Sequence, residues 1–114
     1  MSKYYHGTSY DNLLKIIEDG EIKTSAEGIV YLAETKEDAF RFVVFRHIHE
    51  DIVVIELELD DSKIEETFDH NPIILKCKAF GHDGPISTKL ATNYWKFEAK
   101  ERFKDENYID DWFK

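Results

Sequence analysis

Both strong helical patterns in this sequence fall before residue 50, and three β-strands are predicted after them. The first helix is predicted at residues 9–19, where apolar residues recur at helical spacing and Gly20 fits a left-handed position after the last turn. The second is predicted at residues 36–49, because Thr35 and Asp38 have the spacing of a helix-capping pair. This order lacks the regular βαβ alternation of a doubly wound sheet, so it favours an α+β fold.

The remaining segments are predicted to be strands and turns. The same capping pattern at Thr8 and Asp11 is expected to begin the first helix. Residues 81–85 read Gly-His-Asp-Gly-Pro, a strong turn signal, and the acidic stretch 56–69 is expected to be a solvated edge. β-rich runs predict strands at residues 3–7, 29–33, 52–59, 73–80 and 94–99, with a polar connection at 60–68 and a short helix at 105–114.

Length and charge restrict the class of protein. A chain of 114 residues suits one domain, residues 1–114, and its 42% hydrophobic residues are enough for one core. The net charge is −9, which disfavours general nucleic-acid binding and binding to anionic membrane surfaces, because both depend on Lys and Arg.

Cysteine content and hydropathy indicate a cytoplasmic protein. Cys77 is the single cysteine, so no intrachain disulfide can form, and its apolar strand-like context predicts a structural thiol. The sequence shows neither a signal-peptide core nor an apolar run long enough for a membrane span. We therefore expect a reducing cytosol, either of the protein's own cell or of a host that it enters.

The informative motif is the order of a strand ending in His6-Gly7-Thr8, a helix, the run Gly-Ile-Val-Tyr-Leu-Ala at residues 28–33, and a second helix. Over about residues 3–46 this order resembles the PARP-like and diphtheria-toxin-like branch of the ADP-ribosyltransferases. The resemblance implies a split antiparallel sheet, NAD as co-substrate, and a triad of His, Tyr and an acidic residue. It also implies transfer of ADP-ribose to a macromolecule, most simply a protein, in a phage, toxin or defence role.

The resemblance assigns roles to five residues near the start of the chain. His6 would bond the adenosine ribose of NAD, and the Gly7 backbone would clamp the nicotinamide carboxamide, since glycine permits close approach. Tyr31 would stack on the nicotinamide ring. Thr8 and Ser9 would contact ribose or phosphate, beside a helix N-terminus that offers N–H groups to an anion.

The acidic member of the triad is expected late in the chain. Glu98 is the first candidate, because it lies on the polar face of the predicted strand 94–99. Glu101 and Asp83 are the alternatives. A carboxylate there would steady the oxocarbenium-like ribose that forms as nicotinamide leaves.

Other functions remain open at this point. An NAD glycohydrolase would use the same clamp with water as acceptor, and a non-catalytic binding module or inhibitor would keep the fold without the acid. An RNA 2′-phosphotransferase relative is disfavoured by the acidic composition. Arg41 and Arg46 could meet a pyrophosphate, although a solvated helix face is the simpler interpretation. No metal site is expected, because the histidines and Cys77 lack the usual ligand spacing.

Overall fold

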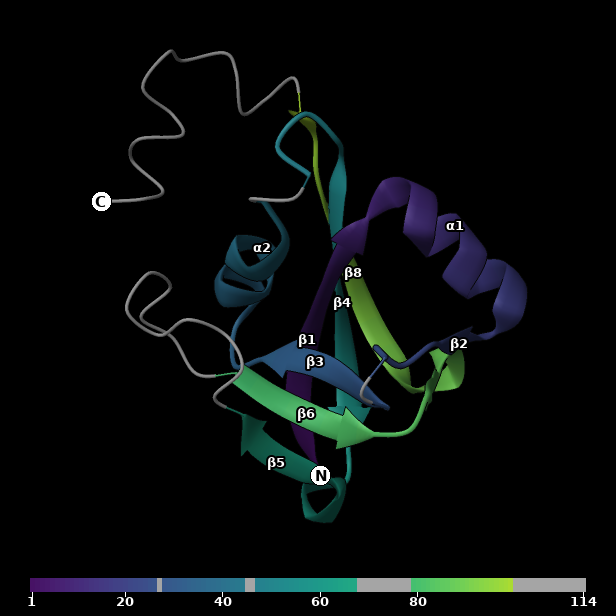
Figure 1. The fold of residues 1–114 in the computed structure, drawn as a ribbon, viewed down its shortest axis with the longest axis vertical. Coiled ribbons are helices and arrows are strands. Elements are labelled where there is room, and N and C mark those ends of the chain that lie inside the picture. The colour runs from purple at the N-terminus through teal and green to yellow at the C-terminus, as the bar shows by residue number, and fades with distance from the viewer. Residues whose placement is uncertain (27, 45–46, 68–78, 100–114) are drawn as a thin grey trace.

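The computed structural model describes residues 1–26, 28–44, 47–67 and 79–99 (Figure 1). Eight strands and two α-helices, with two short 3₁₀ turns, make up this part of the chain. In chain order they are β1 Ser2–Ser9, α1 Tyr10–Asp19, β2 Glu21–Ile22, β3 Ile29–Ala33, α2 Lys36–Val44, β4 Ile52–Leu59, η1 Asp61–Lys63, β5 Ile64–Thr67, β6 Ala79–Asp83, β7 Ile86–Ser87, η2 Thr88–Leu90 and β8 Ala91–Phe97. Neither described helix is long and apolar enough to cross a membrane.

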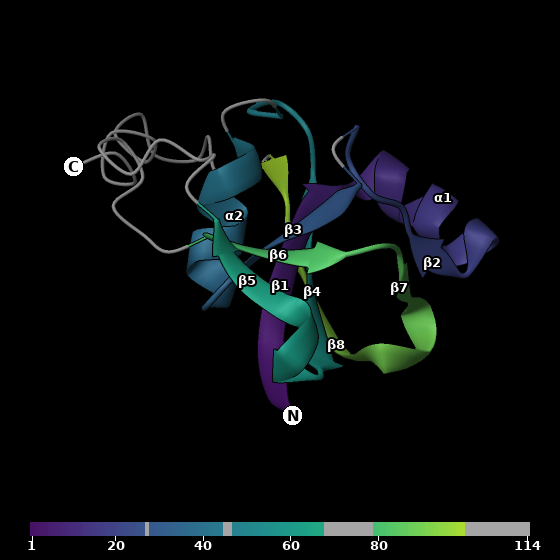
Figure 2. The same ribbon diagram turned by 60° about the horizontal axis from the view of Figure 1, so that its bottom comes forward.

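The main sheet has six strands in the order β5-β6-β3-β1-β4-β8, and every registered pair is antiparallel. Strands β2 and β7 form a separate two-stranded sheet. Helices α1 and α2 lie on opposite sides of the central strands in both ribbon views (Figures 1 and 2). The predicted α+β class, with a split antiparallel sheet and two short N-terminal helices, is confirmed.

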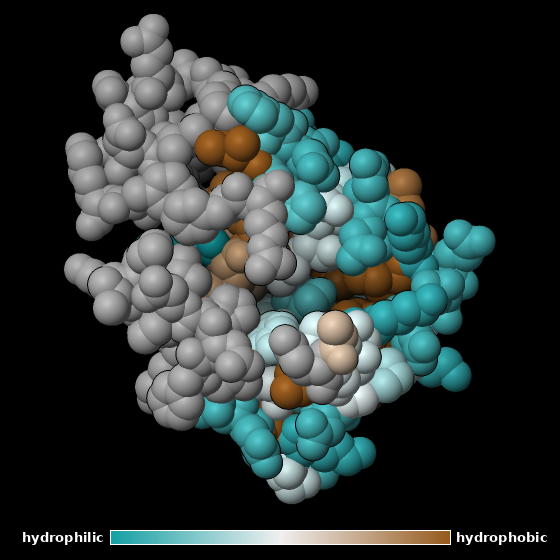
Figure 3. Space-filling view, in the orientation of Figure 1, coloured by the Kyte–Doolittle hydropathy of each residue, from teal (hydrophilic) through white to brown (hydrophobic). Residues whose placement is uncertain are grey.

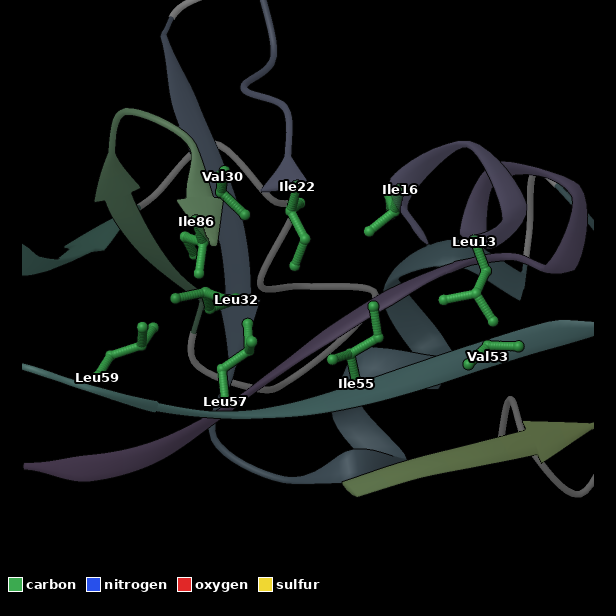
Figure 4. Close-up of a cluster of buried hydrophobic side chains, with 10 residues drawn as sticks. All are labelled: Leu13, Ile16, Ile22, Val30, Leu32, Val53, Ile55, Leu57, Leu59 and Ile86. Atoms are coloured by element: carbon green, nitrogen blue, oxygen red, sulfur yellow. The ribbon is translucent and has the colours of Figure 1, made fainter. Parts of the chain in front are cut away.

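The larger core lies between α1, the small sheet and one face of the main sheet. Alternate residues of β4 face the same way, so its odd-numbered positions from 53 to 59 form a continuous apolar row (Figure 4). They pack against side chains from β3, α1, β2 and β7. The buried members are Leu13, Ile16, Ile22, Val30, Leu32, Val53, Ile55, Leu57, Leu59 and Ile86.

The second core lies under α2, on the other face of the sheet. Ala39, Phe40 and Val44 of the helix pack on Ile52 and Val54 of β4. The two faces of β4 are thus both covered by helices, each with its own apolar cluster.

Figure 3 shows mainly hydrophilic residues on the described surface in that view, with small hydrophobic patches between them.

Local details depart from the sequence prediction at several points. The N-cap of α1 is Ser9 and not Thr8, because the Ser9 hydroxyl accepts the hydrogen bond from the Asn12 amide N–H at 3.2 Å. Gly20 does adopt the left-handed conformation, with φ of 75°. The Asp38 N–H donates to the Thr35 hydroxyl at 3.1 Å as expected, but residues 47–49, predicted as the end of the second helix, are not helical.

Strand positions in the second half also differ. Residues 81–83, predicted as a turn, continue β6, and the turn follows at Gly84 with φ of 81°. Residues 64–67, predicted as a polar connection, form the edge strand β5. Both differences arise from pairing with β3 and β6, which local composition does not encode. The predictions for Cys77 and for residues 105–114 fall outside the described residues.

Candidate functional site

The candidate site lies where β1 and β3 separate. Their antiparallel ladder has a single registered pair, Tyr5 with Ala33, whereas β1 pairs with β4 over all eight residues. Figure 1 shows β3 and β6 running across the direction of β1 and β4. The sheet is therefore divided into two halves, β5-β6-β3 and β1-β4-β8, that meet at one pair of residues.

His6 bridges this division. Its imidazole Nδ1 lies 2.9 Å from the backbone carbonyl oxygen of Tyr31. A carbonyl oxygen can only accept, so Nδ1 carries the proton, and Nε2 of the neutral ring is an acceptor. Burial lowers the pKa of His6 below its ordinary value of 6.5, and the hydrogen bond with the Tyr31 carbonyl opposes this with a smaller effect. The ring is therefore neutral at pH 7, with Nε2 as its acceptor nitrogen.

Tyr31 contributes its backbone to this contact, and its ring belongs to the other face of β3. Val30 and Leu32 face the larger core, so strand alternation places Tyr31 on the opposite side with Ala33. Tyr31 is partly buried and pairs with Gly81 of β6. The structure brings His6 and Tyr31 into contact, although their two side chains leave the sheet on opposite faces.

Gly7 makes room for the packing of α2 on β1. A Cβ atom at this position would collide with the Ala39 carbonyl oxygen and would lie 3.1 Å from Cγ2 of Val43. The missing side chain is the space in which α2 packs on β1. The packing of α2 is therefore sufficient to require glycine at this position.

Thr8 and Ser9 are both buried and both serve the start of α1. The Thr8 hydroxyl accepts from the Asn12 side-chain amide at 2.7 Å, and Ser9 caps the helix through the Asn12 backbone N–H. The Tyr10 N–H donates to the Asp51 carbonyl at 2.9 Å. Hydrogen bonds within the protein thus occupy the Tyr10 and Asn12 N–H groups at the start of α1, where the sequence predicted an anion contact.

The structure does not bring Glu98 to the other predicted triad members. It follows the last residue of β8, and Tyr94 is the β8 residue level with Ile55 and His6. Four residues and two strand spacings separate Glu98 from His6, about 17 Å along the sheet.

Asp83, the alternative acid, lies closer to Tyr31. It pairs with Ile29 on the strand next to β3, on the same face as Tyr31, at a diagonal separation of about 7–8 Å. Glu101 is outside the described residues.

Sequence reasoning missed Glu56, which is 8% exposed in the middle of β4. The Tyr5 hydroxyl donates to its Oε2 at 3.0 Å, and the Thr92 hydroxyl donates to its Oε1 at 2.7 Å. The Lys3 ammonium lies 3.5 Å from the same Oε1. The bond from Thr92, followed by those from Tyr5 and Lys3, holds the pKa of Glu56 below its ordinary value of 4.5, against the opposing effect of burial.

No local signal could have identified Glu56, because the alternation in β4 predicted a wet face for it and for Glu58. Its hydrogen-bond partners lie 51 and 36 residues away in the sequence. Among the other candidates, Arg41 forms an ion pair with Asp38 at 3.4 Å on α2, and Arg46 is outside the described residues. Within the part of the chain that the structure describes, no group of three metal-ligating side chains occurs.

Comparison with known proteins shows a likeness of fold. Among solved structures, the chain is similar to protein CC0527 from Caulobacter crescentus, with a TM-score of 0.63 and 13% sequence identity. That match covers 83% of this chain and 85% of CC0527, and a double mutant of CC0527 gives a TM-score of 0.62. No family model matches the sequence, and a search of curated proteins found no match.

Proposed function

We propose that this protein is an NAD-dependent mono-ADP-ribosyltransferase that modifies a protein target. The observation that carries the proposal is the hydrogen bond between His6 Nδ1 and the Tyr31 carbonyl across the split of the sheet. The sequence motif selected these two residues for one site, and they meet where the sheet divides.

His6 supplies a hydrogen-bond acceptor to the adenosine ribose. Its Nδ1 proton is committed to the Tyr31 carbonyl, so Nε2 accepts from a ribose hydroxyl. The lowered pKa keeps the ring in this neutral form at pH 7. The same bond fixes the orientation of the imidazole, so little rotamer entropy is lost when the ligand binds.

Tyr31 supplies an aromatic surface for nicotinamide. Its ring belongs to the face of β3 where the paired residue on β6 is Gly81. An offset stack on a flat heteroaromatic ring is a favourable geometry for tyrosine. Because the His6 imidazole and the Tyr31 ring lie on opposite faces of the sheet, the proposal requires NAD to cross the split between β1 and β3.

Asp83 replaces Glu98 as the acidic residue in this proposal. When the glycosidic bond breaks, nicotinamide leaves with the bonding electron pair and the ribose C1 becomes cationic. A carboxylate near this carbon stabilises the cation, and the acceptor group then attacks C1 and loses its proton. Asp83 lies on the strand adjacent to β3 and on the face of Tyr31, whereas Glu98 follows the last residue of the far edge strand β8.

The first experiment measures NAD binding by calorimetry. Replacement of His6 or Tyr31 by Ala should each weaken NAD about tenfold, since one hydrogen bond or one stacking contact contributes about 1–2 kcal/mol. The matched controls His49→Ala and Tyr94→Ala, at exposed positions, should bind as the wild type does. If calorimetry detects no heat of binding at millimolar NAD, the proposal is refuted.

The second experiment uses NAD labelled in the adenylate moiety, with and without cell lysate. Label on a lysate protein supports the transferase, release of nicotinamide without protein label identifies a glycohydrolase, and binding without turnover identifies a non-catalytic module. Asp83→Asn should lower turnover by about 100-fold or more with NAD affinity retained, because the charge acts only in the transition state. Glu98→Gln should leave turnover unchanged, and the reverse result would return the acid to Glu98.

A further inference from the structure

Glu56 and the aromatic residues beside it form a second group of chemistry-bearing side chains, on the α2 face of the sheet. Tyr5 connects Glu56 with Trp95. Its hydroxyl donates a hydrogen bond to Glu56, and its ring centroid lies 5.9 Å from that of Trp95. His6, the next residue on β1, points to the other face. Tyr31 and Asp83 share the α2 face, but they belong to β3 and β6 in the other half of the sheet, so this group contains none of the residues of the proposed NAD site.

Two lysines of the protein occupy this group. The Lys3 ammonium lies 3.5 Å from Glu56, and the Lys36 ammonium lies 4.8 Å from the centroid of Trp95. The Lys3 side chain is 58% exposed, whereas the Glu56 side chain is 10% exposed. A solvated cation thus covers a fixed and nearly buried anion, and moving such an exposed lysine away costs little.

The remaining capacity of Glu56 matches a forked donor. A carboxylate has about four acceptor positions, two on each oxygen. Tyr5 takes one on Oε2, and Thr92 and Lys3 take two on Oε1. When Lys3 leaves, one position is open on each oxygen, which is the arrangement that a guanidinium meets with two parallel N–H···O bonds.

We infer that the Glu56–Tyr5–Trp95 group is a binding site for a guanidinium, supplied by an arginine side chain of a partner protein. The planar cation bonds both oxygens of Glu56 and lies against the rings of Tyr5 and Trp95, where Lys3 and Lys36 now lie. Guanidinium is more weakly hydrated than ammonium and stacks on aromatic faces, so it displaces the lysines. The net charge of −9 favours the approach of basic partners to the protein.

The test uses capped arginine, N-acetyl-arginine amide, as the probe and tryptophan fluorescence as the readout. Trp112 is replaced by Phe in all proteins, so that Trp95 is the single tryptophan. Capped arginine should give a saturable change in emission, capped lysine should bind about tenfold more weakly, and neutral capped citrulline should give none. Equal affinity for arginine and lysine, or no saturable change, would overturn the inference.

Variants separate this site from general charge attraction. Lys3→Met should strengthen arginine binding severalfold, because it removes the resident cation. Lys89→Met, which removes an exposed lysine on η2, changes the net charge equally and should have a much smaller effect. Glu56→Gln should weaken binding at least tenfold in protein shown to be folded by circular dichroism. If Glu56→Gln does not fold, the lysine pair decides, and equal effects of the two methionine variants would overturn the site.

Discussion

Replacement of Gly7 by Ala tests whether helix packing is what requires glycine in the His-Gly-Thr motif. Gly7 lies in the extended strand β1, paired with Val54, so its backbone conformation suits any residue. Without steric conflict, such a change would stabilise the protein by about 0.4–1 kcal/mol, because alanine restricts the unfolded chain. The contact with α2 predicts the opposite sign.

The magnitude follows from what the new methyl group would meet. Its nearest neighbours are the carbonyl oxygen and carbon of Ala39, the carbon at 3.0 Å, and both belong to helix backbone that cannot rotate away. Overpacking of a core costs about 1–3 kcal/mol, and a backbone neighbour places this case near the upper value. A loss of about 3 kcal/mol is a large part of the roughly 5–15 kcal/mol that stabilises an ordinary domain.

Urea denaturation followed by circular dichroism measures the effect as a lower transition midpoint with an unchanged slope. Gly20→Ala is the control, because its φ is 75° but no atom lies within 4 Å of the position that the new methyl group would take. It should cost about 1–2 kcal/mol from backbone strain alone. A Gly7→Ala protein as stable as the wild type, or more stable, would refute the packing argument and return Gly7 to a role in ligand approach.

Two further predictions concern pH. The pKa of His6 is lowered in the folded state, so the unfolded chain binds the proton more tightly, and stability should fall as pH drops below about 6.5. His6→Gln should reduce the loss of urea midpoint between about pH 7.5 and 5.5, and parallel losses in both proteins would contradict the assignment. The pKa of Glu56 is also lowered, but for an acid this stabilises the fold above about pH 4.5 and the contribution is lost as pH falls through the lowered value. Glu56→Gln should therefore destabilise by about 2 kcal/mol at pH 7 and by less at about pH 3, whereas the exposed neighbour Glu58→Gln should show neither effect.

The sequence by itself determined the local elements. Strand β3 begins at Ile29 and ends at Ala33 as the β-rich run predicted, and the left-handed Gly20 and the Thr35 cap lie where the pattern placed them. These features depend on backbone and side-chain preferences within about four residues, and such local preferences can be predicted from the sequence. The pairing of His6 with Tyr31 in one candidate site came from the motif.

The tertiary structure alone decided which distant residues meet. The helix over β1 gave Gly7 its packing role, and the register of β8 carried Glu98 away from His6. Glu56 was predicted on a wet face, and it is buried because Tyr5 and Thr92 reach it from strands on either side. Strand alternation fixes which residues share a face, but the partner strands and their register determine what covers that face, and they are set by contacts between segments far apart in the chain.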